Sequence, residues 1–169
     1  MVERTDYIVF GTPQGWMGVL GSPAGLIRCT LPQYSSNVAL QNLGDDIKKA
    51  NRTAEPFKDL IARFQAYFSG DKVDFPDKLD LSQATEFQRS VWETTRAIPY
   101  GATQTYHWIA SRINKPGAAR AVGQALGQNP LPIIVPCHRV LAANGRLGGF
   151  TGGLDMKRLL LKIEGIDTF

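Results

Sequence analysis

Three neighbouring side chains, Cys137, His138 and Arg139, offer the clearest reactive chemistry in this sequence. A thiol reacts as its thiolate, and a nearby imidazole or cation lowers the thiol pKa from about 8.5 toward neutrality. The combination predicts a nucleophilic cysteine with a base beside it. A free cysteine is also among the most buried residue types and often serves only in packing. A purely structural Cys137 therefore remains an alternative at this point.

The residues just before this group predict how the chain delivers it. Residues 133–135, Ile-Ile-Val, are β-branched and lie between prolines, which predicts a short buried strand. Pro136 must end that strand because proline cannot donate to a ladder. Neighbouring side chains on an extended strand point to opposite faces. Cys137 and His138 can then interact only if the backbone bends or a water bridges them.

Length and composition limit the class of protein. The 169 residues are 43% hydrophobic, which is enough for a good core in one domain or in two small ones. No apolar run is long enough to cross a bilayer, and the N-terminus has no signal-peptide pattern. We therefore expect a soluble, cytoplasmic protein without a membrane partner. The two cysteines and two histidines are too scattered to predict a zinc site, so we expect no metal.

Positive charge is concentrated in the half of the chain that contains Cys137. Residues 1–88 carry 9 basic and 11 acidic side chains, whereas residues 89–169 carry 10 and 4. The difference favours a polyanionic partner for the second half. An ordinary basic surface is the alternative.

The first half has the pattern of a small α/β domain. Three β-rich runs separated by Gly- and Pro-containing turns predict an antiparallel sheet, with Cys29 as a packed thiol in the third run. Apolar residues at helical spacing then predict helices over about residues 36–50 and 57–68. Residues 70–84 lack a sustained period, which indicates a linker between domains 1–69 and 85–169. The predicted strands are residues 7–10, 16–20 and 25–31.

The second half is predicted to be mainly helical and to contain a helix-turn-helix. Thr85 is a candidate cap for the first helix, and residues 105–113 and 118–126 form two helices joined by a Gly-containing turn. Any helical hairpin gives this pattern. The outer face of the second helix carries mostly small residues, among them Ala119 and Gly123, with Arg120 and Gln124 as its long polar groups. Small residues let a backbone approach DNA without reading base edges, so we expect docking with little sequence specificity.

Residues 148–153 form a Gly-rich loop behind the reactive group, and residues 154–164 a final helix. The loop lacks the Lys-Ser/Thr signature of a phosphate cradle, so we expect it to form the wall of a pocket instead. Glu164 lies near the end of the final helix. If its carboxylate turns inward it can orient His138 and complete a Cys-His-Glu relay.

The segment around Cys137 closely resembles the active-site segment of the O6-alkylguanine-DNA alkyltransferases, also called methylated-DNA–protein-cysteine methyltransferases. The resemblance is specific, and it covers residues 85–165 strongly but the N-terminal part only in outline. The motifs that carry it are Asn129-Pro130, Pro136-Cys137-His138-Arg139-Val140, Phe87-Gln88, Val91-Trp92, Ile98-Pro99-Tyr100-Gly101, Thr105-Tyr106, Ala119-Arg120-Ala121-Val122-Gly123, Gly152-Gly153 and Glu164-Gly165.

This resemblance implies a role for each matching residue. Cys137 is then the nucleophile that takes an alkyl group from O6 of guanine, His138 its base through a water, and Glu164 the carboxylate that orients the imidazole. Tyr106 serves the rotated nucleotide and Arg120 fills the space that it leaves in the duplex. The remaining implied positions are Asn129 as a hinge, Val140, Phe150 and Thr151 in the substrate pocket, and Ala119, Gly123 and Gln124 on the DNA.

The resemblance implies irreversible transfer, one event per molecule, with double-stranded DNA as partner and no cofactor, and we expect a monomer. The N-terminal zinc site that some members of the family hold does not transfer, because residues 1–88 contain no His and only Cys29. Thr151 stands where the family often has a Ser beside the guanine oxygen, and Phe150 stands where some members have Tyr, so Phe150 lacks the hydroxyl of those members. Two alternatives remain. One is a cysteine hydrolase, and the other is a non-catalytic protein that recognises alkylated DNA.

Overall fold

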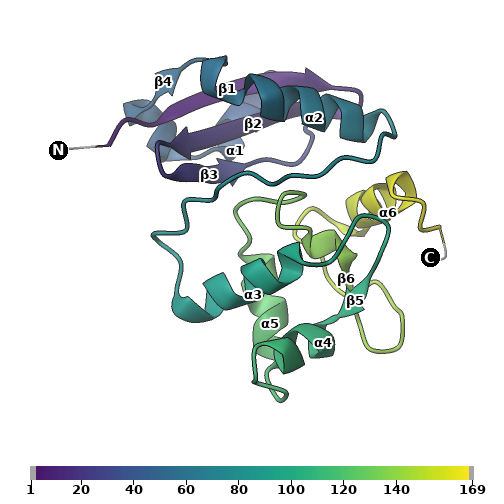
Figure 1. Cartoon of the computed structure of the whole chain (residues 1–169). Helices are drawn as coiled ribbons and strands as arrows, with labels where there is room; N and C mark the ends of the chain where they lie inside the picture. The colour runs from purple at the N-terminus through teal and green to yellow at the C-terminus, as the bar shows by residue number, and fades with distance from the viewer. Residues whose placement is uncertain (1–2, 168–169) are drawn as a thin grey trace. The chain divides into compact units, whose positions relative to one another are not determined.

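The chain folds into two compact units, and the sequence divides between them after Ser82. This computed structural model describes residues 3–167 and is drawn in Figure 1. Within those residues no helix is long and apolar enough to span a membrane.

The first unit contains a small sheet built around a three-stranded antiparallel meander. Strands β1 (Asp6–Thr12), β2 (Gly15–Ser22) and β3 (Gly25–Cys29) pair in the antiparallel sense that the turn residues predicted. Each of the two turns ends in a glycine with positive φ, a conformation that glycine adopts without strain. A two-residue strand that the sequence did not predict, β4 (Asn51–Arg52), adds a parallel edge beside β1. The sheet is therefore mixed, in the order β3-β2-β1-β4 (Figure 1).

Two helices pack on this sheet. Helix α1 (Ser36–Asn42) begins where the Ser35 hydroxyl accepts a hydrogen bond from the amide of residue 38. We predicted this helix to run to about residue 50, and that is wrong. Gly44 has φ 84°, which ends the α-helix, and a 3-10 helix, η1 (Asp45–Lys49), follows.

The second helix of this unit is the one that the apolar stripe predicted. The 3-10 turn η2 (Glu55–Phe57) leads into α2 (Lys58–Phe68), whose inner face buries Leu60, Phe64, Tyr67 and Phe68. Burial of this stripe removes several large apolar side chains from water, which is the main driving force for docking a helix.

The segment that we interpreted as part of a linker is fastened to this first unit. The amide of Leu26 in β3 donates to Lys78 O at 2.9 Å, and Leu26 O accepts from the Asp80 amide at 2.7 Å. The two oxygens of Asp77 accept from the Arg63 guanidinium of α2. Residues 70–82 thus have no helical or β period of their own but are fixed by β3 and α2.

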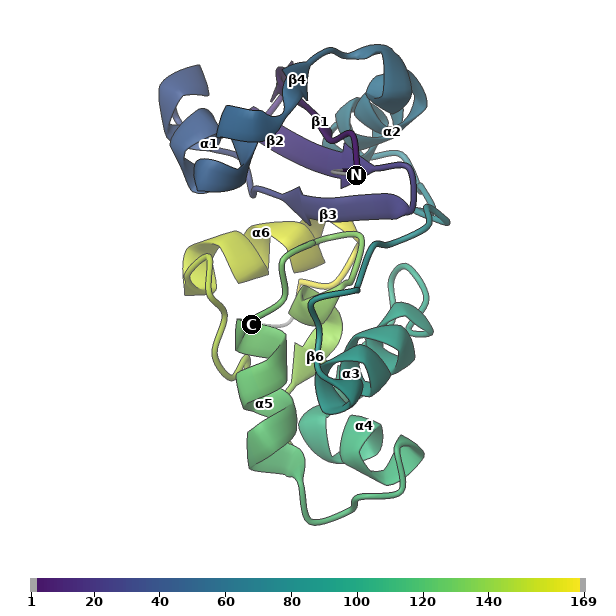
Figure 2. The ribbon, with the colours of Figure 1, turned by 90° about the vertical axis from the view of Figure 1, so that its left-hand side faces the viewer.

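Up to residue 167, the second unit contains four α-helices and a two-stranded parallel ladder. Helix α5 packs against both α3 and α4, and the ladder lies beside them (Figure 2). A capping box joins Thr85 and Gln88 at the start of α3, and the Thr105 hydroxyl caps α4. The α4–α5 pair is the helix-turn-helix that the sequence predicted. The elements are α3 (Glu86–Arg96), β5 (Gln104–Thr105), α4 (Tyr106–Arg112), α5 (Ala119–Gly127), β6 (Val140–Leu141) and α6 (Leu154–Ile163).

The predicted strand at residues 133–135 does not form. These residues are buried as predicted, but Ile133 has φ 75°, so the chain turns there instead of extending. The amide of Val135 donates to Leu131 O at 2.8 Å, which closes the turn. Prolines at 130, 132 and 136 lack the N–H groups that a ladder needs. Apolar character was therefore a signal of burial here and not of a strand.

Candidate active site

Cys137 lies in a single 3-10 turn, η3 (Cys137–Arg139), that starts after Pro136. This turn is the backbone bend that a strand would have prevented. The side-chain amide of Asn129, just beyond the end of α5, donates to the Cys137 sulfur at 3.3 Å and to Val135 O at 2.9 Å. Its oxygen accepts from the Leu131 amide at 2.9 Å. One amide thus ties the end of α5 to the cysteine turn.

Behind the thiol lies a buried ionic network. His138 is 0% exposed, and its Nε2 lies 2.5 Å from Oε2 of Glu164, which caps the C-terminal end of α6. The contact between His138 and Glu164 that a relay requires is therefore made. Oε1 of Glu164 accepts from Arg139 Nε at 2.8 Å and from the Gly101 amide at 3.1 Å. Nδ1 of His138 has no hydrogen-bond partner within residues 3–167.

Burial dominates the ionisation of the thiol and the imidazole. It raises the pKa of Cys137, while the Asn129 hydrogen bond, the charge of Lys157 and the amides of residues 137 and 138 oppose the rise. Our expectation of a lowered thiol pKa is therefore wrong for the free protein. Burial also lowers the pKa of His138, although Glu164 opposes that change. A buried neutral thiol needs a base before it can react, and the neutral imidazole is the group beside it that can act as one.

The carboxylate of Glu164 stays ionised. Burial acts to raise its pKa, but hydrogen bonds and charges from His138 and Arg139 outweigh that and lower the pKa to about 2. At neutral pH the imidazole therefore faces an anion, to which its Nε2–H donates.

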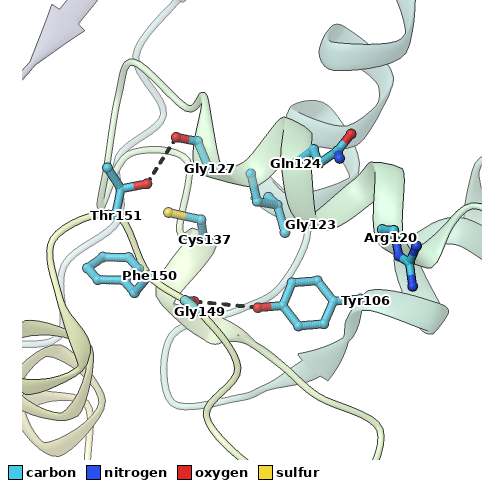
Figure 3. Close-up of a pocket in the computed structure, with 10 residues that line it drawn as sticks. Tyr106, Arg120, Gly123, Gln124, Gly127, Cys137, Gly149, Phe150 and Thr151 are labelled. Atoms are coloured by element: carbon cyan, nitrogen blue, oxygen red, sulfur yellow. Dashed lines mark hydrogen bonds between the residues drawn. The ribbon is translucent and has the colours of Figure 1, made fainter.

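Cys137 lines a pocket of about 500 Å³ between α5 and the Gly-rich loop. Figure 3 shows its sulfur between the end of α5 and the loop residues Phe150 and Thr151, with Arg120 at the other end of the helix. The volume is within the range of small-molecule sites. The lining residues are Tyr106, Arg120, Gly123, Gln124, Leu126, Gly127, Cys137, Gly149, Phe150 and Thr151.

Two hydrogen bonds close the loop onto the helices. The Thr151 hydroxyl donates to Gly127 O at 2.9 Å, and the Tyr106 hydroxyl lies 3.5 Å from Gly149 O (Figure 3). The Thr151 hydroxyl is therefore already engaged in a hydrogen bond to a carbonyl in the last turn of α5. The Phe150 ring also lines the pocket and has no hydrogen-bond donor.

Most of the predicted site residues meet at this pocket, and the others lie around it. Ala119 is the first residue of α5 and does not line the pocket. Val140 is fully buried in β6. Asn129, His138 and Glu164 form the layer behind the sulfur. Among residues 3–167 no three His, Cys, Asp or Glu side chains gather as a metal site would require.

Sequence reasoning missed Lys157. This lysine of α6 is fully buried, and its ammonium donates to the carbonyls of Val140, Leu147 and Gly149. Burial lowers its pKa to about 8, against the opposing effect of Cys137. The signal was present, because residues 157, 160, 161 and 164 share one buried face of α6 at i, i+3, i+4 and i+7. Lys157 anchors the loop that walls the pocket.

The fold and the site together define a helix-turn-helix protein of the DNA-binding class, with a buried cysteine in a pocket beside the second helix. Residues 86–166 match the family model described as the DNA-binding domain of 6-O-methylguanine DNA methyltransferase. A methylated-DNA–protein-cysteine methyltransferase of Methanosarcina acetivorans is 40% identical over 159 residues, which cover 94% of this chain and 97% of the relative. The chain belongs to the methylated-DNA–protein-cysteine methyltransferase family.

Solved structures give the same result. The crystal structure of Mycobacterium tuberculosis OGT in complex with DNA is similar with a TM-score of 0.79 and 39% identity, and the match covers 94% of this chain and 92% of that one. An O6-methylguanine DNA methyltransferase of Methanococcus jannaschii matches with a TM-score of 0.61 and 30% identity, over 95% of each chain. The similarity therefore extends over both units.

Proposed function

We propose that this chain repairs O6-alkylguanine in duplex DNA by moving the alkyl group to its own Cys137, once per molecule. The observation that carries the proposal is the position of the sulfur. It lies in a pocket walled by α5, the second helix of the helix-turn-helix, with the His138–Glu164 pair behind it. The names of the relatives, which include methylated DNA and a protein cysteine, support the same reaction.

Helix α5 is suited to close approach to a DNA groove. Its outer face combines small residues, Ala119 and Gly123, with the exposed side chains of Arg120 and Gln124. A stacked base cannot bring its O6 substituent in line with a thiolate, so the nucleotide must rotate out of the duplex at a cost of a few kcal/mol. We assign Arg120 to the vacated space and Tyr106 to the rotated nucleotide. Both side chains line the pocket.

The transfer needs one proton movement and one displacement. Cys137 gives its proton through a water to Nδ1 of His138, whose other nitrogen donates to Glu164. The thiolate then attacks the alkyl carbon, so that an S–C bond forms and the C–O6 bond breaks. The departing guanine takes the bond electrons and regains a proton from the imidazolium. The products are a thioether and normal guanine.

A thioether is not cleaved by water, and we assign no group to regenerate Cys137. The protein would therefore act once, without a cofactor, and inside the cell, where genomic DNA is found. We also propose residues 85–169 as the domain that carries both DNA binding and transfer. Residues 70–84 join it to an N-terminal domain of residues 1–69, and residues 70–82 of this connection are held on the first unit by β3 and α2.

The test is the intact mass of the protein after incubation with duplex DNA that contains O6-methylguanine. We expect one added methylene per chain, located on Cys137 and not on Cys29 by peptide mapping. Cys137→Ala should bind the same DNA and gain no mass. Repeated turnover without an adduct would indicate the hydrolase, and tight binding without an adduct would indicate a damage-recognition protein. Either result would overturn the proposal.

Arg120→Ala tests base extrusion separately. We expect much slower transfer from duplex DNA but little change with the free modified base, since the free base needs no extrusion. Equal losses on both substrates would exclude the assigned role.

A further inference from the structure

Arg139 lies beside the relay but takes no part in the transfer described above. We propose that Arg139 is the positioning residue that keeps His138 neutral in the resting protein, by binding the second oxygen of Glu164 and offsetting its negative charge. The inference rests on the proposed function, because His138 acts there as the base that accepts the proton of Cys137.

The two oxygens of Glu164 are divided between two partners. Oε2 lies 2.5 Å from His138 Nε2, and Oε1 accepts from Arg139 Nε at 2.8 Å. A second nitrogen of the same guanidinium, Nη1, donates to Ile98 O at 2.7 Å, so Arg139 is held from two sides. A guanidinium does not lose its proton in proteins. Glu164 therefore has a permanent counter-ion and stays an anion that accepts the Nε2–H of the imidazole.

The charges around His138 favour its neutral form. It faces Glu164 and Lys157 from α6, and Arg139 and Cys137 from its own turn. Burial is the largest influence and lowers its pKa; Glu164 raises the pKa, and the charges of Arg139 and Lys157 lower it further. A carboxylate alone beside an imidazole stabilises the imidazolium. Here the guanidinium offsets that effect, which leaves Nδ1 unprotonated and able to accept.

Removal of the Arg139 charge should therefore raise the pH at which the imidazolium of His138 loses its proton. With only Lys157 left as a cation, the full negative charge of Glu164 would favour an imidazolium that has taken its proton from solvent. Such an imidazolium cannot act as the base for the thiol. The loss would be greatest at low pH and would disappear as the pH rises.

The first experiment measures the single-turnover rate of transfer from the free modified base between pH 5 and pH 9, so that DNA binding does not contribute. In Arg139→Gln we expect the acid limb of the profile to move up by about one pH unit or more, with recovery at alkaline pH. Arg139→Lys keeps the charge and should keep the native limb. Arg158→Gln removes an exposed cation of α6 and should also leave the limb in place. A loss by the same factor at every pH would overturn the proposal.

A second experiment does not depend on transfer or on a folded Arg139→Gln variant. The ¹⁵N resonances of the imidazole in the unmodified protein should show His138 as the neutral Nε2–H tautomer from pH 6 to pH 8. Exposed His107 gives an internal reference. An imidazolium at His138 at pH 7 would overturn the inference. If the native protein transfers no alkyl group, the proposed function fails, whereas an imidazolium at His138 defeats the inference about Arg139, so the two failures are distinguishable.

Discussion

The unit that ends at Ser82 keeps its charged side chains outside its core, whereas the unit that begins at Gln83 encloses three charged side chains and a histidine. Among residues 3–82 none of the buried side chains is charged, and pairs such as Lys58–Glu55 are 69% and 75% exposed. The second unit buries a histidine, an arginine, a lysine and a glutamate. Enclosing charges is costly unless each is paired and hydrogen-bonded. This cost is therefore confined to the unit that holds the reactive sulfur.

The largest expected effect breaks the buried network. Glu164→Gln removes the anion shared by His138 and Arg139, so the free energy of unfolding should fall by about 3–5 kcal/mol. The matched change in the first unit, Glu55→Gln, breaks an exposed pair and should cost no more than about 0.5 kcal/mol. Urea unfolding followed by circular dichroism measures both values. Similar losses in the two variants would remove the contrast between the units.

The next largest difference between the two units should be in how their stability depends on acid. The pKa of Glu164 is about 2 in the folded chain against an ordinary value of 4.5, so the ionised form favours folding. Its contribution, about 3 kcal/mol, is complete above pH 4.5 and is lost as the pH falls toward 2. Stability measured from pH 6 to pH 2 should therefore fall less steeply in Glu164→Gln. Asp80→Asn removes a more exposed carboxylate of the first unit and should alter the slope less. An unchanged slope in Glu164→Gln would contradict this assignment.

The wall of the pocket offers a smaller test. A Cβ at Gly148 would lie 2.6 Å from the Tyr106 hydroxyl oxygen, so Gly148→Ala must displace that ring. Displacement of a positioning group by about 1 Å can reduce a rate on the order of 100-fold. Gly145 also has positive φ but no atom near its Cβ position, so Gly145→Ala should strain the backbone by about 1 kcal/mol and leave transfer unchanged. Equal transfer rates in the two variants would argue against the role assigned to Tyr106 in holding the rotated nucleotide.

The loss of stability on removing a helix cap should be the same in the two units. The hydroxyls of Ser35 and Thr85 each accept a hydrogen bond from a backbone amide at the start of a helix. Replacement of either by alanine should lower the free energy of unfolding by about 1 kcal/mol. A clearly larger loss at Thr85 would mean that the second unit is more sensitive in general and not only at its buried charges.

Local patterns predicted the parts of the fold that local physics determines. The glycine turns predicted the meander, and the caps and apolar stripes predicted most of the helices. Residue types and the resemblance identified Cys137, His138 and Glu164. The prediction of a strand at Ile133 was wrong because a buried turn and a buried strand have the same apolar composition. The positive φ of Ile133 follows from its tertiary surroundings. The roles of the site residues stay predictions, whereas their proximity is now established.

The buried charges were the hardest to predict, since a lysine in a helix normally points to solvent. Lys157 belongs to the buried face of α6 only because carbonyls of β6 and the following loop surround its ammonium. Those carbonyls come from residues 8 to 17 positions away along the chain. The helical spacing of Lys157 with Leu160 and Leu161 indicates the buried face, but no local pattern identifies the carbonyls that accept from its ammonium.

The amide of Asn129 also provides a built-in spectroscopic probe. The same nitrogen contacts the Cys137 sulfur and Val135 O, and the amide oxygen accepts from Leu131. A change at the sulfur, whether it loses a proton or gains a carbon, must alter the environment of one assignable NH₂ group. The side-chain resonances of Asn129 can therefore follow the state of the sulfur in real time without a label attached to it.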